Sequence, residues 1–196
     1  MDKGTIIIVE GPRGSGKTPV AKAIEASGFQ KYNCLFIPPD LGRYNGFINW
    51  DYPEQSYAEI MAVSNMHNFG ANIVMDRGII SWCAYNCDRD DASKKLNDWF
   101  TVLSKWKCAI IVCLDSDNKN IKLNIDKKGE TQDLAYPYKF RQMYDLVPGG
   151  IRVYYKVEDY SSNWIFDIEC KIMQKSLETN TFHKMRRRRK NIDGKV

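Results

Sequence analysis

The chain has 196 residues, of which 43% are hydrophobic and 27% are charged, so it is too apolar for general disorder and long enough for one domain with a buried core. Its net charge of +5 comes from residues 184–196, where seven basic residues against one aspartate leave about −1 for the rest. This distribution excludes a broadly basic nucleic-acid platform. No apolar run approaches the ~20 residues of a membrane span, and no signal-peptide pattern is visible. We therefore expect a cytoplasmic protein that does not bind membranes.

Five short apolar segments have the composition of parallel strands that are buried on both faces. They are residues 5–9, 33–37, 71–75, 108–114 and 151–157. Helical spacing predicts helices between and after them, at residues 17–26, 54–68, 79–87, 94–107, 133–146 and 163–178. This alternation predicts an α/β fold with a doubly wound, parallel, five-stranded sheet and helices on both faces. We expect one domain over residues 1–183 and a basic, disordered tail over 184–196.

A glycine-rich motif follows the first strand. Residues 11–18 read GPRGSGKT and satisfy the pattern G-x-x-x-x-G-K-[ST] between a buried strand and a helix. In such a loop, backbone N–H groups and the helix N-terminus bind the phosphates of ATP. The predicted nucleotide-binding residues are Gly11, Arg13, Gly14, Ser15, Gly16, Lys17 and Thr18. We expect Lys17 to reach the β- and γ-phosphates and the Thr18 hydroxyl to bind Mg²⁺. The alternative is a turn that only joins strand to helix.

Asp76 and Arg77 follow the third predicted strand directly. In a parallel sheet the carboxyl ends of the strands meet at the ligand crevice. We therefore expect Asp76 beside the magnesium ion and Arg77 beside the transferred or accepted phosphate. A salt bridge that caps the strand would explain the same pair without a catalytic role.

Here the chain resembles the thymidylate kinase and deoxynucleoside kinase group of P-loop enzymes. The resemblance rests on Ile8-Val9-Glu10-Gly11, the phosphate loop, and Asp76-Arg77-Gly78 followed by Ser81 and Ala84-Tyr85, which is similar to D-R-x-x-x-S-x-x-A-Y. It implies a nucleotide-kinase-like P-loop fold over most of residues 5–157. It also implies a catalytic Asp76 near the metal, and Arg77 and Tyr85 near the acceptor. Thymidylate kinases usually carry a carboxylate where this chain has Arg13.

Residues 123–144 resemble the lid and following helix of deoxynucleoside kinases, and we place the lid around residues 116–135. A lid brings cations over the phosphates and excludes water, and Lys127 and Lys128, with Arg141 as a further candidate, are suited to that role. The related enzymes usually place arginines there. A solvated charged loop is the alternative explanation.

The segment after the second strand contains Asp40 and Arg43. Deoxynucleoside kinases carry an acidic residue at a similar place, which implies that Asp40 is the general base for a hydroxyl acceptor. A phosphate acceptor is already ionised and needs no base. Arg43 is then expected to bind the acceptor. Asp40 as the cap of a turn is the alternative.

These features predict an ATP- and Mg²⁺-dependent phosphotransferase that acts on a nucleoside monophosphate or a deoxynucleoside, as a monomer or homodimer. A second hypothesis is a nucleic-acid kinase of the same fold, which binds DNA or RNA through its basic tail. The tail residues concerned are Arg186, Arg187, Arg188 and Arg189. A third hypothesis is a nucleotide-dependent switch without a phosphoryl acceptor.

Overall fold

The computed structural model describes residues 4–26, 34–37, 53–70, 72–127, 135–149, 152–157 and 164–193, and for 34–37, 53–56, 157 and 179–193 it describes the backbone alone. Its strands are β1 (Thr5–Glu10), β2 (Cys34–Ile37), β3 (Asn72–Asp76), β4 (Cys108–Ser116) and β5 (Arg152–Val157). Its helices are α1 (Lys17–Ala26), α2 (Pro53–Ser64), the 3₁₀ helix η2 (Met66–Phe69), α3 (Ile79–Asn86), α4 (Arg89–Leu103), α5 (Asn118–Asp126), α6 (Ala135–Tyr144) and α7 (Trp164–Asp193).

The five strands form one parallel sheet in the order β2-β3-β1-β4-β5. Strand β1 lies at the centre, where its neighbours are β3 on one side and β4 on the other. Every residue of β1, β3 and β4 is buried, which explains their nearly continuous apolar sequences. The predicted doubly wound α/β fold with five parallel strands is confirmed.

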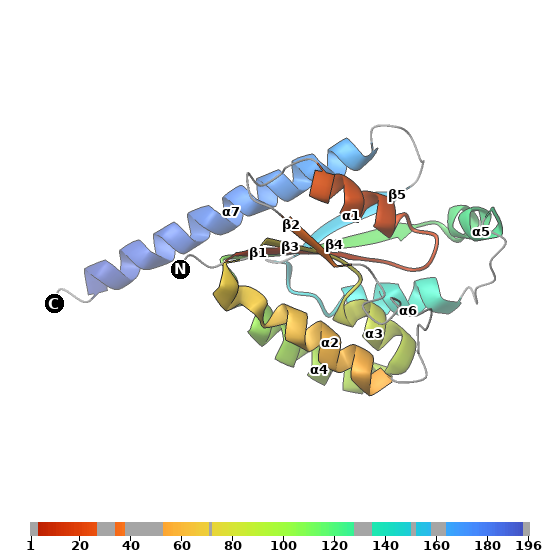
Figure 1. Ribbon diagram of the computed structural model, residues 1–196, viewed down its shortest axis with the longest axis horizontal. Coiled ribbons are helices and arrows are strands. Elements are labelled where there is room, and N and C mark those ends of the chain that lie inside the picture. The colour runs from red at the N-terminus through yellow and green to blue at the C-terminus, as the bar shows by residue number, and fades with distance from the viewer. Residues whose placement is uncertain are drawn as a thin grey trace.

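Helices cover both faces of the sheet, with α1 and α7 on one face and α2, α3, α4 and α6 on the other (Figure 1). Alternate residues of β1 serve the two cores. Ile7 and Val9 pack with α1 and α7, whereas Ile6 and Ile8 pack with the other four helices. The central strand is therefore fixed from both sides, and so is the loop that follows it.

Two helices differ from the sequence-based prediction because of aspartate caps. Helix α4 begins at Arg89 and not at residue 94, since the Asp88 carboxylate accepts a hydrogen bond from the Asp91 amide at 2.9 Å. Helix α5 occupies part of the polar segment assigned to the lid. There the Asp117 carboxylate accepts from the Asn120 amide at 2.7 Å. Each cap satisfies a free amide of the first turn and so starts a helix in a polar sequence.

Helix α7 is longer than the predicted final helix at residues 163–178. Trp164, Ile168 and Ile172 lie on its buried side, packed against the sheet. Its backbone stays helical to Asp193 and so includes residues 184–193, which the composition had indicated to be a disordered tail. Within the described part of the chain, no helix has the length and apolarity needed to cross a bilayer.

Candidate functional site

The phosphate loop joins the central strand β1 to α1. Gly14 and Gly16 have φ values of 80° and 82°, a backbone conformation that favours glycine. The Pro12 carbonyl accepts hydrogen bonds from the Ser15 amide at 3.2 Å, the Ser15 hydroxyl at 2.8 Å and the Lys17 ammonium at 2.6 Å. The Lys17 side chain is thus held within the loop, where it is 6% exposed. Arg13 is exposed.

Helix α5 supports this loop from the side. The Asn124 side-chain amide donates to the Gly14 carbonyl at 3.0 Å, although the two residues are 110 positions apart. A Cβ atom at Gly14 would lie 2.9 Å from the Ile121 carbonyl and 3.1 Å from the Ile125 side chain. The close approach of α5 therefore requires glycine at this position, in addition to the positive φ. The sequence motif gave no indication of this contact.

Thr18 and Asp76 meet where α1 begins and β3 ends. The Thr18 hydroxyl donates to Asp76 Oδ2 at 2.5 Å. Asp76 is 1% exposed, and its Oδ1 atom is buried with no hydrogen-bond partner among the described residues. A hydroxyl and a carboxylate with an unpaired oxygen fit Mg²⁺, which usually takes one or two protein oxygens and completes its shell with water and phosphate. The described residues contain no group of three or more His, Cys, Asp or Glu suited to another metal.

Arg77 lies beside this pair in a strained conformation. Its φ of 83° is rare for a residue other than glycine, and its amide donates to the Val9 carbonyl at 2.9 Å. Its guanidinium donates to the Ser81 hydroxyl at 3.4 Å and lies 5.8 Å from the centre of the Tyr85 ring. Strain of this kind persists only when the surroundings hold it, and it is common at functional sites.

Glu10 is a buried carboxylate at the carboxyl end of β1, and its role was not foreseen from the sequence. It is 0% exposed and accepts hydrogen bonds from the Ile80 amide at 3.2 Å, the Ser81 amide at 3.1 Å and the Ser81 hydroxyl. Burial raises its pKa from 4.5 to about 7, although these hydrogen bonds and the nearby Arg77 charge lower it. The carboxyl group therefore changes its charge near neutral pH.

We predict that Glu10 makes the fold less stable as the pH rises. The pKa of about 7 in the folded protein lies above the ordinary 4.5, so the folded state holds this proton more tightly than the unfolded state. The resulting contribution to the unfolding free energy is complete below pH 4.5 and is lost as the pH rises through 7. This amounts to about 2–3 kcal/mol of unfolding free energy between pH 5 and pH 8. A Glu10→Gln variant should lose this pH dependence, which urea unfolding at pH 5, 6, 7 and 8 would measure.

Among the described residues, Glu10 interacts electrostatically with Arg77, Cys83, Cys113 and Tyr144. Burial raises the pKa of both thiols and of the tyrosine, so these three groups stay uncharged up to pH 8. Equal pH dependence of stability in the variant and the wild type would contradict the prediction.

A second buried carboxylate, Asp115, lies at the end of the neighbouring strand β4. Arg141 of α6 donates to both of its oxygens, at 3.1 and 3.0 Å, and to the Ser116 carbonyl at 2.8 Å. The Tyr154 hydroxyl also donates to Asp115, at 3.0 Å. Asp115 is thus fully paired, unlike Asp76. Arg141, a further candidate for a lid cation, is therefore paired with the Asp115 carboxylate.

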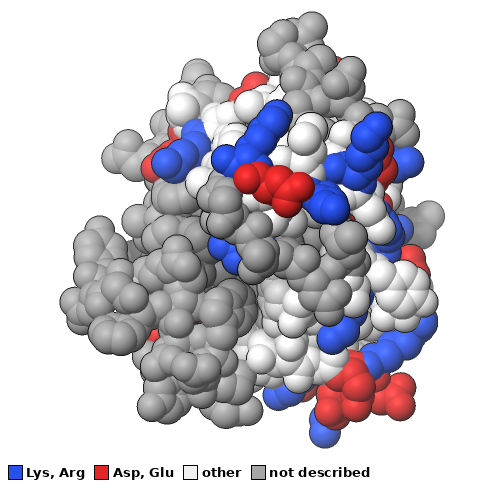
Figure 2. Space-filling model, turned by 90° about the vertical axis from the view of Figure 1, so that its right-hand side faces the viewer, with Lys and Arg blue, Asp and Glu red and all other residues white. Residues whose placement is uncertain are grey.

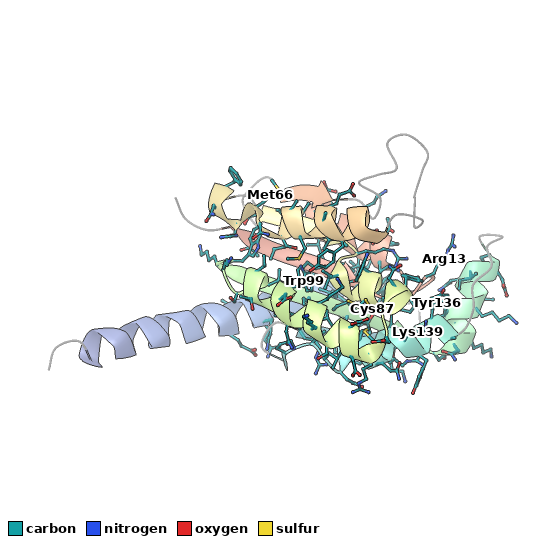
Figure 3. All side chains as sticks on the ribbon, turned by 90° about the horizontal axis from the view of Figure 1, so that it is seen from below. Arg13, Met66, Cys87, Trp99, Tyr136 and Lys139 are labelled. Atoms are coloured by element: carbon teal, nitrogen blue, oxygen red, sulfur yellow. The ribbon has the colours of Figure 1, made fainter. Side chains whose placement is uncertain are left out.

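Tyr85 connects α3 to α6 through aromatic contacts. Its ring centre lies 4.7 Å from that of Tyr136 and 5.7 Å from that of Phe140, and the Lys139 ammonium lies 5.4 Å from the centre of Tyr136. Figure 3 shows Tyr136 and Lys139 toward the same end of the molecule as Arg13, with Met66 toward the other end. The predicted acceptor-side tyrosine therefore belongs to the end that carries the phosphate loop.

Several predicted site residues lie outside the described residues: Asp40, Arg43 and Lys128. Lys127 is exposed and directly follows α5. The roles of these four residues, and of the lid, stay predictions. Figure 2 views the molecule from the side that carries the loop, and on its described surface Lys and Arg side chains are scattered, with Asp and Glu beside some of them.

Comparison with known proteins adds evidence on the fold. No protein-family model matches the chain, and no curated protein matches it. Two solved structures of deoxyadenosine kinase from M. mycoides do match. The one with bound dCTP has a TM-score of 0.53 and 15% identity, and the match covers 86% of this chain and 99% of that one. The one with the products dCMP and a flexible dCDP has a TM-score of 0.50 and 17% identity, with 87% and 97% covered.

This chain has the fold of a P-loop deoxynucleoside kinase. At such low identity the likeness extends to the fold alone, and the chemistry must be argued from the residues described above.

Proposed function

We propose that this protein is an ATP-dependent phosphotransferase that moves the γ-phosphoryl group to a nucleoside monophosphate or a deoxynucleoside. One observation carries the proposal. The phosphate loop with Lys17, the Thr18–Asp76 pair and the strained Arg77 follow two adjacent strands, β1 and β3, at the edge where the strand order reverses. Open α/β sheets bind their ligands at this place.

Each of these residues has a distinct task in the proposed reaction. The loop amides and Lys17 bind the phosphate oxygens of ATP and neutralise charge on the transferred group. Thr18 and Asp76 would hold Mg²⁺, which would supply further charge neutralisation. Arg77 orients the acceptor. A bond forms between an acceptor oxygen and the γ-phosphorus, the bond from that phosphorus to the bridging oxygen breaks, and ADP leaves.

The acceptor decides whether a base is required. A phosphate acceptor is already ionised, whereas the proton of a hydroxyl acceptor must be removed, a role that we assign to Asp40. Both matching structures contain bound deoxycytidine nucleotides, which supports a deoxynucleoside or its monophosphate as the acceptor class.

The test is transfer of labelled γ-phosphate to deoxynucleosides, nucleoside monophosphates and oligonucleotides in parallel reactions. We expect a phosphorylated product with one or more of the free nucleosides or nucleotides. Hydrolysis of ATP without any phosphorylated product would overturn the proposal and favour the nucleotide-dependent switch.

A nucleic-acid kinase of the same fold is the second candidate. Helix α7 carries residues 186–190 (RRRRK), and it directs them away from the end of the molecule that has the phosphate loop (Figure 1). A polymer held by these residues would have to extend along the sheet to reach the loop, so we favour the small acceptor. The nucleic-acid kinase would become the favoured candidate if the protein phosphorylates oligonucleotides and this activity falls when residues 185–196 are removed.

A further inference from the structure

Ser81 connects two charged groups of the site. Its hydroxyl donates to a carboxylate oxygen of Glu10 and accepts from the Arg77 guanidinium at 3.4 Å. Ser81 is 1% exposed and lies in the first turn of α3, whereas Glu10 ends the central strand β1. Carboxylate, hydroxyl and guanidinium thus form a chain from the start of the phosphate loop to the acceptor side.

The position of Glu10 follows from the amides at the start of α3. A helix begins with N–H groups that have no partner within the helix, and here the Ile80 and Ser81 amides both donate to the Glu10 carboxylate. A fully buried carboxylate needs such donors. Glu10 therefore fixes the start of α3 against β1.

The turn between β3 and α3 fits closely around this carboxylate. A Cβ atom at Gly78 would lie 2.9 Å from Glu10 Oε1 and 3.0 Å from the Ile8 side chain. The turn has no room for a larger residue while Glu10 occupies its place. The turn of residues 76–78 is thus packed directly against the Glu10 carboxylate.

Arg77 depends on contacts that come from α3. Its backbone is strained, and its side chain follows the helix to the Ser81 hydroxyl and then to the ring of Tyr85, one turn further on. Tyr85 in turn packs against α6. A long arginine side chain otherwise has many rotamers, so these contacts reduce its freedom before an acceptor binds.

We infer that Glu10 and Ser81 are positioning residues that hold Arg77 in the orientation in which it binds the phosphoryl acceptor, an inference that rests on the proposed function. Both residues are buried, so they act through Arg77 and not by contact with the reactants. Glu10 orients Ser81 and the start of α3, and Ser81 orients the guanidinium.

A Ser81→Ala variant tests this inference. Because Arg77 serves the acceptor and the loop serves ATP, we expect the KM for the acceptor to rise about three- to tenfold, the effect of one hydrogen bond, while the KM for ATP changes less than twofold. Ser81→Thr retains a hydroxyl, so its KM for the acceptor should lie close to that of the wild type. The matched control is Ser64→Ala, which removes another buried hydroxyl, the one that accepts from Trp99 Nε1 at 2.8 Å.

A double variant tests whether Glu10 acts through Ser81. If it does, Glu10→Gln combined with Ser81→Ala should raise the acceptor KM no further than Ser81→Ala alone. Additive effects, or equal changes in both KM values, would overturn the inference in favour of a purely structural role.

A measurement without substrates separates this inference from the proposed function. The NMR order parameter of the Arg77 guanidinium should fall in Ser81→Ala and stay unchanged in Ser64→Ala. An unchanged order parameter in Ser81→Ala overturns the inference even if the wild type is an active kinase. A wild type that transfers no phosphoryl group instead refutes the proposed function.

Discussion

A Lys17→Met variant is expected to lose phosphoryl transfer by on the order of 10²–10³-fold and to bind ATP more weakly. Methionine keeps most of the length and the apolar stem of lysine but removes the ammonium group that the Pro12 carbonyl now binds. The side chain is nearly buried, so its charge is poorly screened and its loss is costly. Steady-state kinetics and calorimetric titration with ATP would measure the two effects.

The matched control is Lys22→Met on the same helix, α1, where the lysine is exposed. It should retain the activity of the wild type. If Lys17→Met transfers phosphate as fast as this control, the glycine-rich segment is only a turn between strand and helix.

The second large effect is expected for Asp76→Asn. Replacing one carboxylate oxygen by an amide NH₂ group removes the negative charge, and with it the oxygen that we propose as a magnesium ligand, while keeping the size of the side chain. We predict a loss of transfer on the order of a hundredfold or more and a higher Mg²⁺ concentration for half-maximal activity. Magnesium titrations of the rate, together with Mg²⁺ binding followed calorimetrically in the presence of ADP, would test both parts.

Asp115→Asn is the matched control for this experiment. Asp115 is likewise a buried carboxylate at the carboxyl end of a central strand, but Arg141 and Tyr154 already occupy its oxygens. Its replacement should weaken the fold and leave the magnesium dependence unchanged. If Asp76→Asn and the wild type require the same Mg²⁺ concentration, Asp76 is not a magnesium ligand.

Much of the fold could be predicted because the strands are short apolar runs with clear ends. The five predicted strands agree with the structure to within one or two residues at each end. The predicted helix at residues 94–107 starts five residues later than α4 because residues 88–93 are polar and lack an apolar helical pattern. An aspartate followed by acidic residues is a common helix start, so this signal was present in the sequence.

The site was predictable where it depends on neighbouring strands. The carboxyl ends of parallel strands meet at one edge, and this rule places Asp76 near the phosphate loop, where it contacts Thr18. The partners of Glu10 could not be predicted, since Ser81 is 71 residues away and the contact depends on how α3 packs on β1. The ion pair between Arg141 of α6 and Asp115 of β4 could not be predicted either, because it depends on how the helix packs on the sheet.

The support of the phosphate loop by α5 restricts how this fold can be modified. Between the loop and the helix there is no space for a side chain at Gly14, and the helix is itself part of the segment that we predict to be the lid. A lid taken from a kinase of the same fold would have to bring residues that match Ile121, Asn124 and Ile125. A chimera that ignored this fit would distort nucleotide binding even if its new lid folded correctly.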